Sequence, residues 1–269
     1  MKKGILIFYQ EWTDIINQLA LIDYHLVSYD ELIVILRSDA EGIYEHYLKG
    51  KSSVVKKYIS GHKNMTMLQS ILNQYNQTEY DYLCYGKYDT FRNDEYKNVW
   101  GQLCRSLPLK EHFNKLLYTS YGIDHKDRVE HFSFVRDIEL EDTVYNKFIT
   151  DNSNDYILYH DNHLNDSTMS FERKDDQTYV NINGITDKPF SFIKVLMNAK
   201  EIHLVDSFWA SICYHIDARY NLLKDVDIFL YPFKGGSNRW GGLVKDISYK
   251  DELELQPKQL QNWKIVTNE

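Results

Sequence analysis

The first 37 residues constrain the fold of this chain more than any other segment. Residues 4–9 (GILIFY) and residues 31–37 (ELIVILR) are continuous apolar runs. Between them, apolar residues recur at helical spacing, namely Ile15, Ile16, Leu19, Ile22 and Leu26. Uninterrupted apolar runs are typical of parallel strands that are buried on both faces. The pattern therefore predicts a strand–helix–strand unit with a right-handed crossover.

Similar alternation continues along the rest of the chain. Further strands are expected at residues 54–60, 82–85, 156–160, 178–182, 201–205 and 226–231, with residues 131–135 as a strand or an extended crossing segment. Further helices are expected at residues 65–75, 111–121, 139–149, 190–199 and 207–216, and a helical or irregular tail follows. A polar break, DNSND, lies at residues 151–155. We expect an α/β protein with two Rossmann-like lobes, residues 1–150 and 151–269, whose carboxyl edges face a cleft.

Composition excludes several classes of function. The chain has 31 basic and 39 acidic residues, a net charge of −8, and no dense Lys/Arg run, so a nucleic acid is not an expected partner. No stretch approaches the ~20 apolar residues that span a bilayer. The N-terminal apolar run is too short for a signal peptide. Cys84, Cys104 and Cys213 match no zinc or disulfide spacing, which predicts a reducing, cytoplasmic location.

The turn after the first strand contains a candidate catalytic carboxylate. Asp14 lies where the first helix is expected to begin, at the carboxyl edge of the strand. The helix dipole favours an ionised carboxylate there, and a general base must be ionised. Asp14 could instead serve only as the helix cap.

The second half offers a candidate seat for phosphate groups. Asp206, Ser207, Phe208 and Trp209 lie at the start of an expected helix, where backbone N–H groups and the Ser207 hydroxyl can hold a diphosphate. Such donors would also stabilise the charge that develops on a departing nucleoside diphosphate. The alternative is an ordinary capping arrangement.

Two further kinds of side chain could bind a donor. His160 and Asp161 end an expected strand at the same edge; His160 could donate to a phosphate or a sugar hydroxyl, and Asp161 could orient His160 or bind a sugar. Arg136 and Arg173 are candidate cations for the phosphates, although lone cations are usually solvated.

No metal ion or other cofactor is expected. His160 and His163 have the spacing of a metal pair, but the loop offers no convincing third ligand. The Asp-x-Asp triplet at residues 225–227 precedes its strand, whereas a metal-bound diphosphate would need it at the strand's end.

Three segments resemble known glycosyltransferases. Residues 5–22 (ILIFYQEWTDIINQLALI) are similar to the opening of metal-independent GT-B glycosyltransferases, in particular the lipopolysaccharide heptosyltransferases. Residues 156–174 (YILYHDNHLNDSTMSFERK) and 197–216 (MNAKEIHLVDSFWASICYHI) resemble poorly characterised glycosyltransferases of marine microbes and large algal viruses. The resemblance implies a compact GT-B-like fold.

The resemblance also implies an activity. It implies metal-independent, inverting transfer of a sugar from a nucleotide-diphosphate donor, a UDP-sugar such as UDP-L-rhamnose, to a glycan acceptor. Asp14 would be the catalytic base, with Trp12 and Thr13 on the acceptor side, and the donor would bind the second lobe. Two alternatives stay open: a non-catalytic nucleotide- or sugar-binding protein, and another enzyme that modifies nucleotide sugars. An epimerase of the dinucleotide type would need a glycine-rich first turn, and this chain has Gln10-Glu11-Trp12 there.

Overall fold

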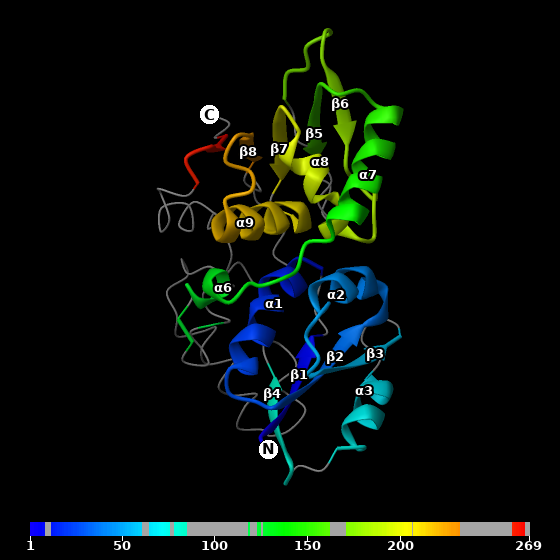
Figure 1. Ribbon diagram of the computed structural model, residues 1–269, viewed down its shortest axis with the longest axis vertical. Helices are drawn as coiled ribbons and strands as arrows, with labels where there is room; N and C mark the ends of the chain where they lie inside the picture. The colour runs from blue at the N-terminus through cyan, green and yellow to red at the C-terminus, as the bar shows by residue number, and fades with distance from the viewer. Residues whose placement is uncertain are drawn as a thin grey trace. The chain divides into compact units, whose positions relative to one another are not determined.

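A computed structural model describes most of the chain as two compact units, Met1–Val135 and Arg136–Glu269 (Figure 1). The residues described are 1–8, 12–60, 65–75, 78–84, 118, 123–124, 126–161, 171–205, 207–231 and 260–266. For residues 12–14, 65, 69, 82 and 84 the description extends to the backbone alone. Each unit contains one sheet, and every strand pair in both sheets is parallel. The expected α/β class is confirmed.

The first unit is built on a four-stranded sheet of order β3-β2-β1-β4. Its strands are β1 (Lys3–Phe8), β2 (Glu31–Arg37), β3 (Val54–Ile59) and β4 (Tyr80–Cys84). Its helices are α1 (Trp12–Leu26), the short η1 (Ser38–Ala40), α2 (Glu41–Tyr47), α3 (Met65–Leu72) and α6 (Asp127–Glu130). Leu68 and Ile71 of α3 pack against Ile5 and Ile33 on one face of the sheet. The strand order is that of one half of a Rossmann fold.

Residues 131–135 are the last of the first unit, and within the described chain they pair with no strand. Side chains hold them instead: the Ser133 N–H donates to the Tyr47 hydroxyl (3.1 Å), and Lys51 Nζ donates to the Ser133 carbonyl (2.7 Å). The Tyr47 hydroxyl in turn donates to Asp23 (2.6 Å), which also pairs with Lys51. The segment expected as a strand or a crossing segment is therefore not a strand, and a partly buried polar network tethers it in place of a sheet.

The second unit is built on a five-stranded sheet of order β6-β5-β7-β8-β9. Its strands are β5 (Tyr156–His160), β6 (Thr178–Asn181), β7 (Glu201–Val205), β8 (Asp227–Tyr231) and β9 (Trp263–Ile265). Its helices are α7 (Ile138–Asp151), the short η3 (Pro189–Phe192), α8 (Ile193–Met197) and α9 (Phe208–Tyr220). This is the flavodoxin-like strand order, in which the first strand lies between the second and the third.

The two faces of the second sheet are covered differently. On one face, Tyr156 of β5 packs on Phe148 of α7 and donates its hydroxyl to the Val195 carbonyl of α8 (2.8 Å). On the other face, His203 of β7 is stacked between Phe171 and Phe229, with ring centroids 4.5 and 4.6 Å away. Phe171 belongs to the connection from β5 to β6, which runs across the sheet in the opposite sense to the later connections. A right-handed crossover places such a connection on the face opposite α8, and Phe171, in the described part of the connection, lies on that face.

Three features differ from the expectation. Helix α7 belongs to the second unit, whereas we expected the lobes to divide near residue 151. Its Phe148 packs on Phe192, and its Asp142 pairs with Lys194 (2.6 Å). The tail contributes a strand, β9, at residues where helix or irregular structure was expected. The short elements η1, α2 and α6 were not expected. Apart from Tyr118, the helix expected at residues 111–121 lies outside the described residues.

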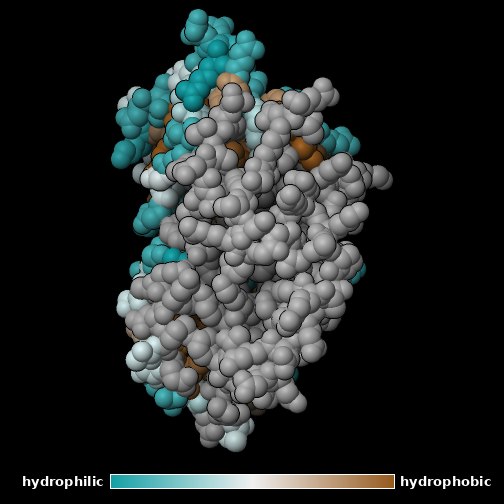
Figure 2. Space-filling view, turned by 180° about the vertical axis from the view of Figure 1, so that it is seen from behind, coloured by the Kyte–Doolittle hydropathy of each residue, from teal (hydrophilic) through white to brown (hydrophobic). Residues whose placement is uncertain are grey.

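No helix in the described part of the chain is long and apolar enough to cross a bilayer. In the face shown in Figure 2, hydrophilic residues predominate among the coloured ones and hydrophobic residues form small patches.

His25 makes the stability of the first unit sensitive to acid. It lies in the last turn of α1 and is 8% exposed; burial, and secondarily the charge of Lys2, lowers its pKa to about 4. In the unfolded chain the pKa is about 6.5, so between these values only the unfolded state binds the proton. We expect the free energy of unfolding to fall as pH drops from 7 to 4, with about 3 kcal/mol of the loss due to His25. In His25→Gln, urea unfolding at the two pH values should show a correspondingly smaller loss; an unchanged loss would contradict the assignment.

Candidate functional site

The carboxyl edge of the second sheet is the place where this fold can bind a ligand. Strand β5 lies between β6 and β7, so the connection from β5 to β6 and the connection from β6 to β7 run in opposite directions across the sheet. In open parallel sheets, ligands bind outside the carboxyl ends of the strands at such a switch point. His160 ends β5 and pairs with Leu204 of β7, while Ser207 follows the end of β7. The fold therefore brings His160, Asp161 and Ser207 to one edge, as the sequence predicted.

Ser207 occupies the capping position of α9 without acting as a side-chain cap. Its backbone is extended (φ −160°, ψ 177°), but its hydroxyl makes no capping bond. The residue is 6% exposed, and the buried Oγ has no hydrogen-bond partner within the described chain. A buried hydroxyl without a partner destabilises a folded protein by about 1–3 kcal/mol. The Ser207 hydroxyl thus stands, without a partner in the described chain, at the start of a helix, where the first N–H groups have no acceptor within the helix.

The two residues that follow Ser207 have different surroundings. Trp209 is 3% exposed and packs on Phe192, so it belongs to the core beneath the edge. Phe208 is half-buried and contacts the Trp209 ring edge-on. Asp206 lies outside the described residues.

The Asp161 carboxylate is oriented by β6 and the turn that follows it. Its Oδ1 accepts hydrogen bonds from Asn181 Nδ2 (3.1 Å) and from Asn183 Nδ2 (2.9 Å). These two bonds come from the asparagines and not from the half-buried His160, which the sequence suggested as a partner of Asp161. Sequence reasoning missed both asparagines; the available signal was an Asn-x-Asn triplet at the end of an expected strand on the same edge.

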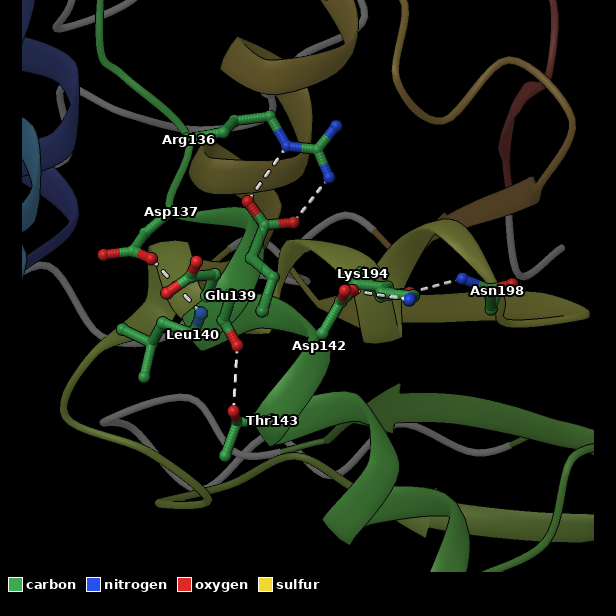
Figure 3. A network of polar contacts seen from close by, with 9 residues as sticks. Arg136, Asp137, Glu139, Leu140, Asp142, Thr143, Lys194 and Asn198 are labelled. Carbon is green, nitrogen blue, oxygen red and sulfur yellow. Dashed lines mark hydrogen bonds and ion pairs between the residues drawn. The ribbon is translucent and has the colours of Figure 1, made fainter.

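The two candidate arginines are engaged elsewhere in the second unit. The guanidinium of Arg173 lies over Tyr159, 4.4 Å from the ring centroid, and also near Phe171 and Tyr179, on the sheet face away from α7 and α8. Arg136 precedes α7, and its fork binds both oxygens of the buried Glu141 (Nε–Oε1 2.9 Å; Figure 3). This bond raises the pKa of Arg136. A phosphate would have to compete with Glu141 for Arg136 and with the aromatic rings for Arg173.

The carboxyl edge of the first sheet is also polar. The strand order reverses between β1 and β4, and α1 begins just after the end of β1, so the backbone of Trp12, Thr13 and Asp14 lies at this second switch point. The side chains of these three residues lie outside the described part of the structure. Arg37, which the sequence analysis did not single out, ends β2 at the same edge, is 7% exposed and pairs with Asp39.

The described residues contain no group of three or more metal-ligating side chains. Asp227, of the Asp-x-Asp triplet, begins β8 and binds Lys264 of β9 (2.7 Å). The triplet thus lies at the amino end of its strand, where it was expected. His163 lies outside the described residues.

Comparisons of the chain with models of protein families, with curated proteins and with solved structures gave no match. Any functional argument therefore depends on the residues of the site.

Replacement of Ser207 tests whether its hydroxyl is unpartnered. In Ser207→Ala, the free energy of unfolding should stay within about 0.5 kcal/mol of the parent or rise, because no hydrogen bond is lost. The matched control is Ser191→Ala: Ser191 is 2% exposed and its Oγ donates to the Lys188 carbonyl (2.7 Å), so about 1 kcal/mol should be lost. Urea unfolding measures both. A loss of 1 kcal/mol or more in Ser207→Ala would show that the hydroxyl caps α9.

Proposed function

We propose that the protein is a glycosyltransferase that moves a sugar from a nucleotide-diphosphate donor to a glycan acceptor, with inversion at the anomeric carbon and without a metal ion. The donor binds at the carboxyl edge of the second sheet and the acceptor at that of the first. The proposal requires these two edges to act on one reaction, as in the GT-B enzymes that the sequence resembles. A UDP-sugar, such as UDP-L-rhamnose, is the donor that the resemblance favours.

The observation that supports the proposal best is the state of Ser207. A buried hydroxyl that has no partner among the described residues stands at the start of a helix, at the switch point of a parallel sheet. The positive end of the helix dipole and the N–H groups of the first turn favour an anion. A diphosphate supplies acceptor oxygens for the N–H groups and for the Ser207 hydroxyl together.

The same groups suit the chemistry of sugar transfer. Asp14 takes the proton of the acceptor hydroxyl, whose oxygen attacks the anomeric carbon. The bond from that carbon to the diphosphate oxygen breaks, and its electron pair leaves with the nucleoside diphosphate. The α9 N–H groups and Ser207 stabilise this increasing negative charge. His160, at the end of β5, is placed on the same edge to donate to the leaving group.

Nucleotide binding is the first test. Thermal unfolding followed with UDP, GDP and ADP should show stabilisation by one of them, about 2.7 kcal/mol at a ligand concentration of a hundred times Kd. Ser207→Ala should weaken this binding, whereas Ser191→Ala, which alters a buried serine of η3, should not. If none of the three nucleotides stabilises the parent protein, the proposed donor site is wrong.

Turnover is the second test, and it separates an enzyme from a binding protein. Asp14→Asn should reduce transfer or hydrolysis of the donor by at least about a hundredfold, since general bases contribute 10²–10⁴-fold, and leave nucleotide affinity within about twofold. The assay is release of nucleoside diphosphate from UDP-sugars. Full activity in Asp14→Asn would remove this residue from the mechanism, and tight nucleotide binding with no turnover in the parent protein would favour a non-catalytic role.

A further inference from the structure

We propose that Asp161, Asn181 and Asn183, here called the ribose cluster, bind the two hydroxyls of the ribose in the nucleoside diphosphate. This inference rests on the proposed function, because it extends the donor site from the diphosphate to the nucleoside. It also assigns to Asp161 a part of the donor other than the transferred sugar.

The ribose cluster lies at the ends of two neighbouring strands and in the turn that follows β6. The Ile182 N–H donates to the Tyr159 carbonyl (2.9 Å), which extends the pairing of β5 with β6 beyond Asn181. The Asn183 N–H donates to Asn181 Oδ1 (2.9 Å), and Gly184 follows with φ +63°, a left-handed conformation that favours glycine. The two asparagine side chains are thereby fixed beside Asp161.

The hydrogen-bonding capacity of the ribose cluster is only partly used. Both asparagine amides donate to the same oxygen of Asp161, Oδ1. Within the described chain, the other carboxylate oxygen, Oδ2, has no partner, and neither has the buried Oδ1 of Asn183. Two acceptors therefore remain, one from a carboxylate and one from an amide.

Two free acceptors match a vicinal diol. Each ribose hydroxyl donates one hydrogen bond, and an ionised carboxylate can only accept. A phosphate offers acceptor oxygens and negative charge, so the Asp161 carboxylate would repel it. The ribose cluster therefore selects the uncharged part of a nucleotide, whereas the start of α9 selects its charged part.

The position of the ribose cluster agrees with separate recognition of the ribose and of the diphosphate. β5 is the direct neighbour of both β6 and β7, so the cluster and Ser207 share one edge. Adjacent strands lie ~4.8 Å apart, which places the cluster and the start of α9 within about two strand spacings, ~10 Å. A ribose and the diphosphate attached to it can cover such a span.

Isothermal titration calorimetry with matched ligands tests the inference. The unaltered protein is titrated with UDP, with dideoxy-UDP, which lacks both ribose hydroxyls, and with pyrophosphate; ADP or GDP and its dideoxy form replace UDP if one of them binds more tightly. Because dideoxy-UDP cannot make the hydrogen bonds to the charged acceptor, its affinity should be about 10- to 100-fold lower than that of UDP.

Two variants assign the effect to Asp161. Asp161→Asn should lower the affinity for UDP by a similar factor and leave the affinity for pyrophosphate within about twofold. The variant should bind dideoxy-UDP no more weakly than the parent protein does. The control is Asp155→Asn: Asp155 precedes β5 at the opposite edge of the sheet, its side chain is 76% exposed, and UDP affinity should not change.

The outcomes separate the inference from the proposed function. If UDP binds but dideoxy-UDP binds equally well, or if Asp161→Asn weakens UDP and pyrophosphate equally, the ribose assignment is overturned and the diphosphate site stands. Loss of UDP binding on adding EDTA would also overturn it, because carboxylate and amide oxygens are ligands for Mg²⁺ or Ca²⁺. If no nucleoside diphosphate binds, both proposals fail. Should Asp161→Asn not fold, the comparison of UDP with dideoxy-UDP on the unaltered protein still decides.

Discussion

Parallel pairing of apolar strands is the constraint on which both units depend. A tight turn cannot join two neighbouring parallel strands. The chain must therefore return to the opposite edge of the sheet before the next strand begins. Every strand of a sheet therefore ends at the same edge, and the segments that follow, such as the starts of α1 and α9, gather there. The apolar strands supply the stability of each unit, which leaves the residues just after them available for polar ligands.

The sequence predicted β1 and β2 well because they are continuous apolar runs, for which few other structures bury the side chains. The predictions for β1, β2, β5 and β7 agree with the structure to within a residue or two. Strand order is a different kind of information, since it depends on which distant segments pair, and no local pattern encodes it. Strand β9 has only Trp263–Ile265, too few residues to show a period, and α7 was assigned to the first lobe because its contacts through Phe148 are non-local.

The candidate site shows the same division between local and non-local information. That Ser207 would begin a helix follows from its neighbours in sequence, and the structure agrees. That its hydroxyl would remain unpartnered depends on packing around α9, which the sequence does not show. Asn181 and Asn183 became candidates only when β6 was placed beside β5, and the pairing of Arg136 with Glu141 depends on how the chain enters α7.

Buried polar groups differ in whether the chain itself satisfies them. At the opposite end of α9, the buried Asp217 accepts from the Leu223 N–H and the Trp263 indole, both at 2.9 Å, so this chain can satisfy a buried polar group. Each of Asn17, Tyr44, Asn183 and Ser207 has a buried polar atom without a partner in the described chain. Ser207 and Asn183 lie at the carboxyl edge of the second sheet. Asn17 is in the second turn of α1. The charges of Arg37 and Asp39 act on the pKa of the Tyr44 hydroxyl. Because buried groups of this kind destabilise the folded chain, a ligand at the edge of the second sheet that completed the hydrogen bonds of Ser207 and Asn183 would stabilise it.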